Sequence, residues 1–298
     1  MKRYFIDPTL PQWKGNFHCH TTESDGHRTP AEVARFYEEA GYDFLAITDH
    51  RKVVDPASIR SGLLLIPGTE LDYFITRGHR QAIHIVGVGV DLGLMDTPGL
   101  MDSPQQGIDG IIAAGGKAIF AHPAWSLNDP EAIMGLRGLS AVEVYNHMSD
   151  DPWNGRRGDS TAILDLCCAD GCCLPYVAGD DCHNYDGDQC HSALIVTCAE
   201  REQGAVLNAM AQGRVYASQG PVIKELSIED DTVYLRCSTA QQVIFNSNAM
   251  YAKERVVVRR GITEASYPLR DYETFIRVEV TDLWGRGAWS SPILLKDR

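Results

Sequence analysis

Histidines and carboxylates recur along this 298-residue chain in short clusters, several of which directly follow apolar runs typical of β-strands. His18 and His20 form the first cluster, and in an extended segment residues two apart project to the same side. His50 ends the next apolar run, and Glu70 follows the one after. Imidazole nitrogens and carboxylate oxygens bind divalent cations, and a carboxylate can bridge two of them. These residues therefore predict a metal centre.

The later clusters continue the same pattern. His122 follows the apolar run 118–121, and Asp181 and His183 again lie two residues apart. His84 stands within an apolar strand, where a lone histidine is more often a core residue than a ligand, but the neighbouring clusters favour a ligand. Asp180 precedes Asp181, and the sequence leaves open which of the two faces the ions.

The segments that must position these residues alternate between strand-like runs and amphipathic helices as far as Pro221, which is typical of a parallel α/β domain. Thr29-Pro30-Ala31-Glu32 predicts a helix start with a capping box, and Ser103-Pro104 repeats the signal. In such a fold, active sites are built at the carboxyl ends of parallel strands. Strands are expected at 44–47, 118–121, 141–145 and 174–178.

After Pro221 the residue pattern changes to alternating Val, Ile, Thr, Tyr and Arg, as in the run 275–280, and the spacing of apolar residues typical of helices nearly disappears. This change predicts two domains. Residues 1–220 are expected to form the α/β domain, and residues 221–298 a small antiparallel β domain of a sandwich-like kind.

Together, the clusters resemble the successive motifs of the PHP (polymerase and histidinol phosphatase) superfamily, over residues 14 to 220. Within it the chain is most similar to CehA/McbA-type metallohydrolases, through segments 41–50, 213–218 and 289–293. The resemblance implies a distorted TIM-like barrel with two or three divalent ions, Mn, Fe or Zn, at the strand ends. The motifs are His18-x-His20 with Asp25, Thr48-Asp49-His50, Glu70, His84, Ala121-His122-Pro123 and Asp181-x-His183.

The resemblance also implies a role for each residue. One ion would be held by His18, His20, Glu70 and Asp181, and a second by Asp25, His50 and His183. Glu70 would bridge to a third ion held with His84 and His122. Asp25 precedes a glycine and on its own would be a turn residue, so its ligand role comes from the resemblance alone.

Ions held in this way supply hydrolytic chemistry. A water that bridges them loses a proton near neutral pH, and the resulting hydroxide attacks an electrophile whose developing charge the ions stabilise. Because phosphoryl transfer needs mostly positioning and charge neutralisation, we expect a phosphoesterase acting on a small phosphorylated metabolite or nucleotide. The expected catalytic residues are Glu70, Asp181 and His147, the last as a proton shuttle to the leaving group.

Two arginine pairs are candidates for binding the phosphate, since guanidinium forks suit bidentate phosphate recognition. The alternative is that both pairs lie in solvated turns. His27 and His191 are interpreted as loop or surface residues. The pairs are Arg77 with Arg80 and Arg156 with Arg157.

Two other functions remain open. The same metals could hydrolyse a carboxyl ester or carbamate, or the fold could be a non-catalytic metal-binding scaffold. A basic pocket rim would favour phosphate, and an apolar rim the ester or carbamate. The complete set of ligand residues speaks against the scaffold.

The composition bounds the class of protein. The formal net charge of −13 disfavours a large nucleic-acid surface. The sequence shows no secretory signal and no apolar stretch that could span a bilayer, so a cytoplasmic enzyme with a small-molecule substrate and no membrane partner is expected. Nine cysteines fit reduced thiols better than a disulfide framework. The oligomeric state is not indicated.

Overall fold

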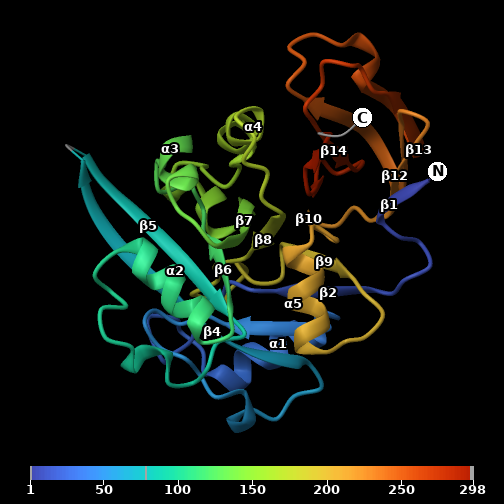
Figure 1. Ribbon diagram of the computed structural model, residues 1–298. Coiled ribbons are helices and arrows are strands. Elements are labelled where there is room, and N and C mark those ends of the chain that lie inside the picture. Colours follow the sequence, from blue (N-terminus) through green and yellow to red (C-terminus); the bar gives the residue numbers. More distant parts are fainter. Residues whose placement is uncertain (1, 78, 296–298) are drawn as a thin grey trace.

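The computed structural model describes the backbone of residues 2–77 and 79–295, and their side chains except in the segment 75–81. This part of the chain forms a larger lobe with five α-helices and a smaller lobe made mostly of strands (Figure 1). The helices are α1 (Pro30–Glu39), α2 (Pro104–Ala113), α3 (Pro130–Met134), α4 (Thr161–Ala169) and α5 (Gln203–Ala211). The strands are β1 (Arg3–Ile6), β2 (Gln12–Asn16), β3 (Phe44–Ile47), β4 (Leu64–Arg77), β5 (His79–Val88), β6 (Lys117–Phe120), β7 (Leu139–Asn146), β8 (Tyr176–Gly179), β9 (Ala193–Thr197), β10 (Val215–Ser218), β11 (Ile223–Glu229), β12 (Thr232–Ser247), β13 (Val256–Pro268), β14 (Phe275–Thr281), β15 (Gly287–Ser290) and β16 (Ile293–Leu294).

Helix α1 begins where the sequence predicts. The Thr29 side chain accepts the backbone N–H of Glu32, and the Glu32 carboxylate accepts the N–H of Thr29 at 2.9 Å, which completes a capping box. The Ser103 side chain caps α2 by accepting the N–H of Gln106. Both helices and the strands β3, β6, β7 and β8 are confirmed, with their ends shifted by a residue or two.

The sheet is mixed, and the prediction of a parallel sheet is wrong for β5. Strands β2, β3 and β4 run parallel, as do β6, β7 and β8, but β5 is antiparallel to both β4 and β6. In the long β4–β5 hairpin, Glu70 pairs with Val86 and Asp72 with His84. β4 continues well beyond Glu70, and β5 extends on both sides of His84. Both residues therefore lie inside strands rather than at strand ends.

The strand path is open, so the strands do not close into the distorted TIM-like barrel expected from the sequence. Over the described strands the path of paired strands ends at β8, which pairs with β7 alone. The edge of β2 that β8 would need for closure is occupied by β9, which pairs with β2 in antiparallel orientation. A single isolated bridge between Cys19 and Cys182 joins the segments that follow β2 and β8. The fold is therefore mixed α/β.

A shared apolar core fixes the spacing of these strands. It contains buried residues from every strand between β3 and β10, among them Ala46, Ile66 and Val86, together with one face of α5. Burying such side chains is the main favourable term in folding. The core thus holds the segments after β2, β3, β6 and β8 close to one another.

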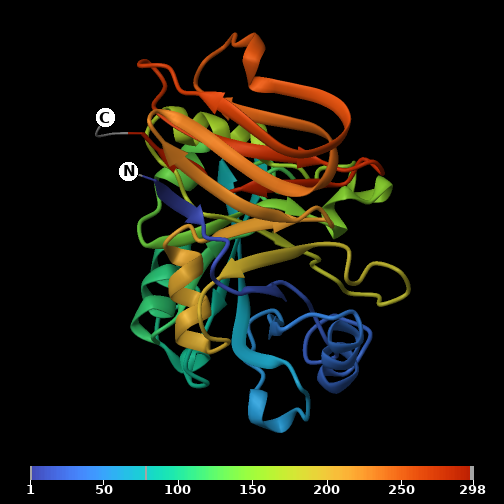
Figure 2. The same ribbon diagram turned by 90° about the vertical axis from the view of Figure 1, so that its right-hand side faces the viewer.

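The C-terminal strands pair in antiparallel orientation and continue the same path of strands. β11, β12, β13, β14 and β16 form one group, and β15 links it to β10. The first strand, β1, pairs with β11, so the N-terminus lies beside the C-terminal strands (Figure 2). The division into domains at residue 220 stays a prediction.

One buried ion pair connects the two lobes. The guanidinium of Arg277 on β14 donates to both carboxylate oxygens of Asp165 on α4, at 2.6 and 2.7 Å, and to Glu279 at 3.2 Å. Burial works against its charge, but the Asp165 hydrogen bonds hold the pKa of Arg277 above its usual value. Burial raises the pKa of Glu279, so this carboxylate depends on its cationic neighbour.

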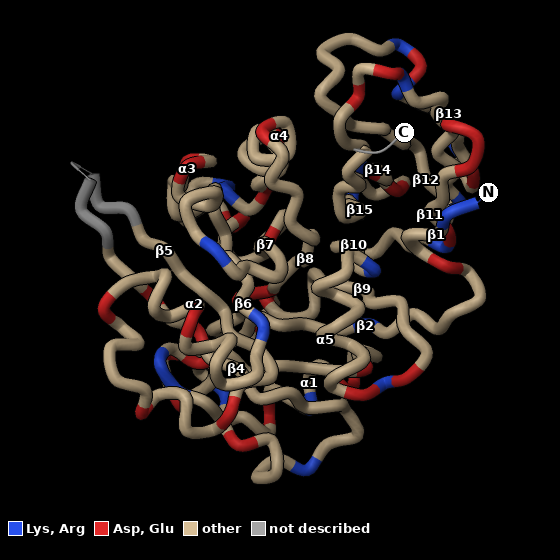
Figure 3. Tube along the Cα trace, in the orientation of Figure 1, with Lys and Arg blue, Asp and Glu red and all other residues tan. Residues whose placement is uncertain are grey.

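Basic residues are dispersed among acidic ones over both lobes (Figure 3). In the described part of the chain, no helix is long and apolar enough to cross a membrane. The cytoplasmic location and the absence of a large nucleic-acid surface stay predictions.

Replacing Arg277 with methionine is expected to lower the free energy of unfolding by about 1–3 kcal/mol, because the change leaves the partly buried carboxylates of Asp165 and Glu279 without their buried cation. Urea unfolding monitored by circular dichroism measures the loss. Arg35→Met, which breaks an exposed pair with Glu39, serves as the control and should cost less than about 0.5 kcal/mol. Equal losses in the two variants would contradict the role of the buried pair.

Candidate metal centre

The first cluster lies in the segment that follows β2. The backbone N–H of Asp181 donates to the carbonyl of His18, and that of His20 donates to Cys182, so the segments after β2 and β8 run side by side. Both imidazoles are buried. Asp181 Oδ1 lies 3.2 Å from His18 Nε2 and 3.1 Å from His20 Nε2. Residues two apart therefore do point to one side, as the extended spacing predicts.

Glu70 is the centre of the cluster. Its carboxylate is 1% exposed and has five imidazoles within 3.3 Å. Because β4 and β5 are antiparallel, His84 lies beside it on the same face of the hairpin, with Nδ1 2.8 Å from Glu70 Oε1. The other four are His18, His20, His50 and His122.

The nine predicted metal-binding side chains fall into three groups whose nitrogen and oxygen atoms lie within 4.8 Å of one another. Their grouping matches the assignment implied by the resemblance, except that His20 belongs to two groups. Their roles as ligands stay predictions. The groups are His18, His20, Glu70 and Asp181; His20, Asp25, His50 and His183; and Glu70, His84 and His122.

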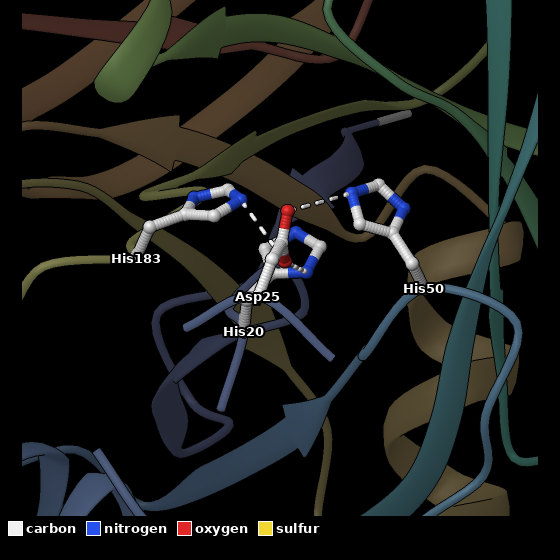
Figure 4. Close-up of side chains that lie close together, drawn as sticks. All are labelled: His20, Asp25, His50 and His183. Atoms are coloured by element: carbon white, nitrogen blue, oxygen red, sulfur yellow. Dashed lines mark ion pairs between the residues drawn. The ribbon is translucent and has the colours of Figure 1, made fainter. Parts of the chain in front are cut away.

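Asp25 reaches the cluster from an exposed loop. Figure 4 shows its carboxylate between the rings of His183 and His50, at 3.6 and 3.7 Å. The loop is held by Asp49, a buried carboxylate that accepts the backbone N–H and hydroxyl of Thr21, both at 2.7 Å, and the hydroxyl of Ser24 at 2.6 Å. Asp49 therefore positions the loop, although it belongs to the same sequence cluster as His50.

The structure distinguishes the two neighbouring aspartates. Asp180 faces away from the imidazoles and accepts a hydrogen bond from the hydroxyl of Tyr37 at 2.8 Å and others from the backbone N–H groups of residues 190–192. Burial raises the pKa of Asp180. Asp181 faces the imidazoles, so it is the candidate ligand of the two.

Three residues in or beside the cluster have a left-handed backbone. These are His122 with φ 28°, Asp181 with φ 54° and Arg51, directly after His50, with φ 53°. Non-glycine residues in this region carry conformational strain that surrounding contacts must offset, and such residues gather at functional sites.

The carboxylates and imidazoles shift each other's protonation. Burial disfavours charge on His18 and His20, but the charges of Asp181, Glu143 and Glu70 raise the pKa of His18 well above its usual value. Hydrogen bonds to Asp181 and Glu70 likewise outweigh burial at His20 and raise its pKa to about 9. Burial would raise the pKa of Glu70, yet neighbouring imidazoles hold it well below its usual range. The buried negative charge therefore requires cations beside it.

Metal ions would fit this requirement. Among the described residues, three buried ring nitrogens near the carboxylates make no hydrogen bond: His18 Nε2, His20 Nδ1 and His50 Nδ1. Buried polar atoms without partners are rare in proteins and are explained where an ion can bind them. Mixed imidazole and carboxylate donors suit Mn, Fe and Zn alike, so this donor set does not select one metal.

Two supporting residues are absent from the sequence prediction. Glu143, buried in β7, lies with Oε1 2.7 Å from His18 Nδ1, and its Oε2 accepts the backbone N–H of His122 at 2.9 Å. The Ser126 hydroxyl lies 3.0 Å from His122 Nδ1. The one available signal for Glu143 is a carboxylate between two valines in an apolar strand.

A pocket of about 420 Å³ opens onto the cluster. Arg156 and Arg157 do not line it, and the side chains of Arg77 and Arg80 lie outside the described residues, so phosphate binding by these arginines stays a prediction. His147 also lies outside the lining and stacks on His191 with ring centroids 4.1 Å apart. His27, interpreted from the sequence as a loop or surface residue, does line the pocket.

Replacing Glu143 with glutamine is expected to weaken metal binding by about 10- to 100-fold. The amide places an NH₂ group against either the His18 ring or the backbone N–H of His122, so one of these two ligands loses the contact that positions it. The affinity is measured by calorimetric titration with Mn²⁺ or Zn²⁺ after a chelator has removed bound metal from the protein.

Glu273→Gln is the matched control, since Glu273 is also buried and hydrogen-bonded but lies in the C-terminal lobe. Its metal affinity should stay at the wild-type value. Unchanged affinity in Glu143→Gln would show that Glu143 does not orient the ligands.

Comparisons with known proteins give a partial picture. No family model matches the chain. A 5'-3' exoribonuclease of Haemophilus influenzae is 36% identical over 83 residues, which are 26% of this chain and 29% of that protein. The 5'-3' exoribonuclease Rnm of Escherichia coli is 40% identical over 84 residues, 26% of this chain and 28% of that protein. The chain thus matches less than a third of the length of these relatives.

One solved structure supports the fold. A two-domain protein from Bacteroides vulgatus, described as containing a predicted PHP-like metal-dependent phosphoesterase, aligns with a TM-score of 0.54 at 15% identity. The alignment covers 93% of this chain and 92% of that one. At this identity the likeness concerns the fold alone. The closer resemblance to CehA/McbA-type members stays a prediction.

Proposed function

We propose that this chain is a metal-dependent phosphoesterase of the PHP type that acts on a small phosphorylated metabolite or nucleotide. The observation that carries the proposal is the buried Glu70 carboxylate, which is shared by two groups of candidate ligands beneath an open pocket. In the reaction, a water oxygen forms a bond to phosphorus, the bond from phosphorus to the alcohol oxygen breaks, and a proton passes to the alcohol.

The three groups of side chains would hold two or three divalent ions, with Glu70 as the shared ligand, since a carboxylate can bridge two ions. Ions bound there would polarise a phosphoryl oxygen and acidify a water molecule near neutral pH. Glu70 and Asp181 belong to the proposed catalytic set because they lie between imidazoles of different strands and fix their separation. A proton-transfer role for His147 stays a prediction.

The pocket residues define how a substrate could bind. Among the described lining residues there is no lysine or arginine, and the acidic ones are Asp25, Glu70 and Asp181. The three carboxylates oppose the binding of a phosphate group, and bound cations would offset their charge. Binding of a phosphoester should therefore depend on the metals themselves, and the substrate's own contacts with the chain would come from its alcohol part.

The same observation favours a second candidate. A rim without described basic residues, carrying two tryptophans, also suits an uncharged carboxyl ester or carbamate. The partial likeness to exoribonucleases and the fold of a PHP-like phosphoesterase support the phosphate ester, because both of those relatives are named for phosphoester chemistry.

The test is metal analysis of the purified chain together with release of phosphate from a panel of phosphomonoesters and cyclic phosphodiesters, with Mn²⁺ added or chelated. Metal-dependent release supports the proposal. A metal-loaded chain that releases no phosphate but hydrolyses aryl acetates or carbamates would support the second candidate. A chain that binds no metal would contradict both.

Glu70→Ala is expected to lower bound metal and reduce hydrolysis by at least about 100-fold, because it removes the ligand shared between groups and its contribution to charge stabilisation. Metal content by mass spectrometry and initial rates are measured on the same samples. Glu273→Gln should retain both. Wild-type metal content and rate in Glu70→Ala would contradict a bridging role.

A further inference from the structure

One wall of the pocket is made of indole rings, and we infer that the exposed face of Trp153 receives a flat aromatic group on the alcohol part of the substrate ester. This inference deepens the proposed function and rests on it. It names a class of substrate, aromatic esters, and the residue that selects that class.

The candidate ligands form the floor of the pocket, and the remaining lining residues form its sides. Two of these remaining residues are His27 and Asn184. The others come from two 3-10 turns at 148–150 and 152–154, together with Trp125 from the segment after β6. The aromatic area of the described lining, apart from the imidazoles, therefore belongs to Trp125 and Trp153.

Trp125 is fixed against the candidate metal ligands. Its ring meets those of His122 and His84 edge to face, with centroids 5.0 and 6.0 Å apart. Its indole N–H donates to Asn154 Oδ1 at 3.0 Å, and the Asn154 amide donates to the carbonyl of Met148 at 2.8 Å. These bonds connect the turn that carries Trp153 to the floor of the pocket.

Trp153 itself is held in place but left open to solvent. Its side chain is exposed to 72%, and its indole N–H donates to Asp151 Oδ2 at 3.2 Å. The turn begins at Pro152, whose ring fixes the backbone, and ends at Gly155 in the left-handed region with φ 78°. A large apolar ring that is oriented by its own hydrogen bond and exposed beside a pocket is suited to cover a ligand.

The placement decides which part of the substrate meets the ring. The phosphoryl group would lie on the floor, where the cations are expected, so the alcohol part extends toward the rim. Stacking on an aromatic side chain contributes beyond the burial of equal apolar area, by a factor of about 3 to 10 in affinity. A flat aromatic alcohol gains this contribution, whereas a saturated ring of equal size gains burial alone.

The test compares benzyl phosphate with cyclohexylmethyl phosphate. Both are monoesters of primary alcohols with the same charge and nearly the same size, so flatness is the main difference in binding; benzyl alcohol is the slightly better leaving group, so the preference is measured in KM and against the same ratio in Trp153→Ala. The metal-loaded wild-type chain should favour the benzyl ester by about 3- to 10-fold in kcat/KM, mostly through KM.

Trp153→Ala should reduce this preference to nearly one and lower kcat/KM for benzyl phosphate by about 10-fold or more. Trp153→Phe should retain the preference. Trp284→Ala is the matched control, because Trp284 is 78% exposed but lies outside the pocket lining, and it should behave as wild type. A wild type without preference, or a preference that persists in Trp153→Ala, overturns the inference.

A binding measurement separates this inference from the proposed function. If no phosphoester of the panel is hydrolysed, the phosphoesterase proposal fails, and calorimetric titration with benzylphosphonate and cyclohexylmethylphosphonate still tests whether Trp153 binds an aromatic group. Tighter binding of the benzyl compound to the metal-loaded chain, lost in Trp153→Ala, supports the stacking site. Equal binding of the two compounds, or no binding, overturns it.

Discussion

The arrangement of this protein depends on one buried carboxylate. Glu70 lies among five imidazoles with almost no access to water, and a carboxylate in such a place is tolerated only if positive charge and hydrogen bonds surround it. The imidazoles come from four separate segments of the chain. Strands β2 to β8, the hairpin and the Cys19–Cys182 bridge can therefore be understood as the scaffold that brings these segments to one carboxylate.

Three other buried carboxylates near the centre have a different task. Glu143 orients His18 and the backbone of His122, Asp49 holds the loop of Asp25, and Asp180 holds the turn at residues 190–192. Glu143 contacts one imidazole of the cluster, that of His18, and Asp49 and Asp180 accept their hydrogen bonds from other groups. The acidic residues of the site thus form two sets. The candidate ligands face the proposed ions, and the supporting carboxylates hold these ligands and their loops in place; metal sites generally need both sets.

The nine side chains that the sequence singles out do lie together, because the signals that mark them are local. A spacing of two in an extended segment places His18 beside His20, and a capping box fixes the start of α1 within one residue.

What the sequence misses depends on contacts between distant segments. β5 is antiparallel because β4 turns directly back into it as a hairpin. The sheet does not close because β9 occupies the edge of β2. Glu143 shows no recognisable spacing, since its partners are 125 and 21 residues away. The sequence also leaves the character of the rim open, because it depends on loop conformations; among the described residues these place two tryptophans, and neither Arg156 nor Arg157, in the lining.

The contact between the segments after β2 and β8 has a consequence for the order of folding. His20 and Asp181 are separated by 161 positions in the chain, and they meet beside a single bridge rather than a full ladder. Contacts of such long range close slowly, because the intervening chain must be ordered before they form. During synthesis the first histidines leave the ribosome long before Asp181 and His183 exist. The complete set of donors can therefore be assembled only when the large lobe is nearly finished, and binding of the ions would then stabilise the folded chain rather than guide its early steps.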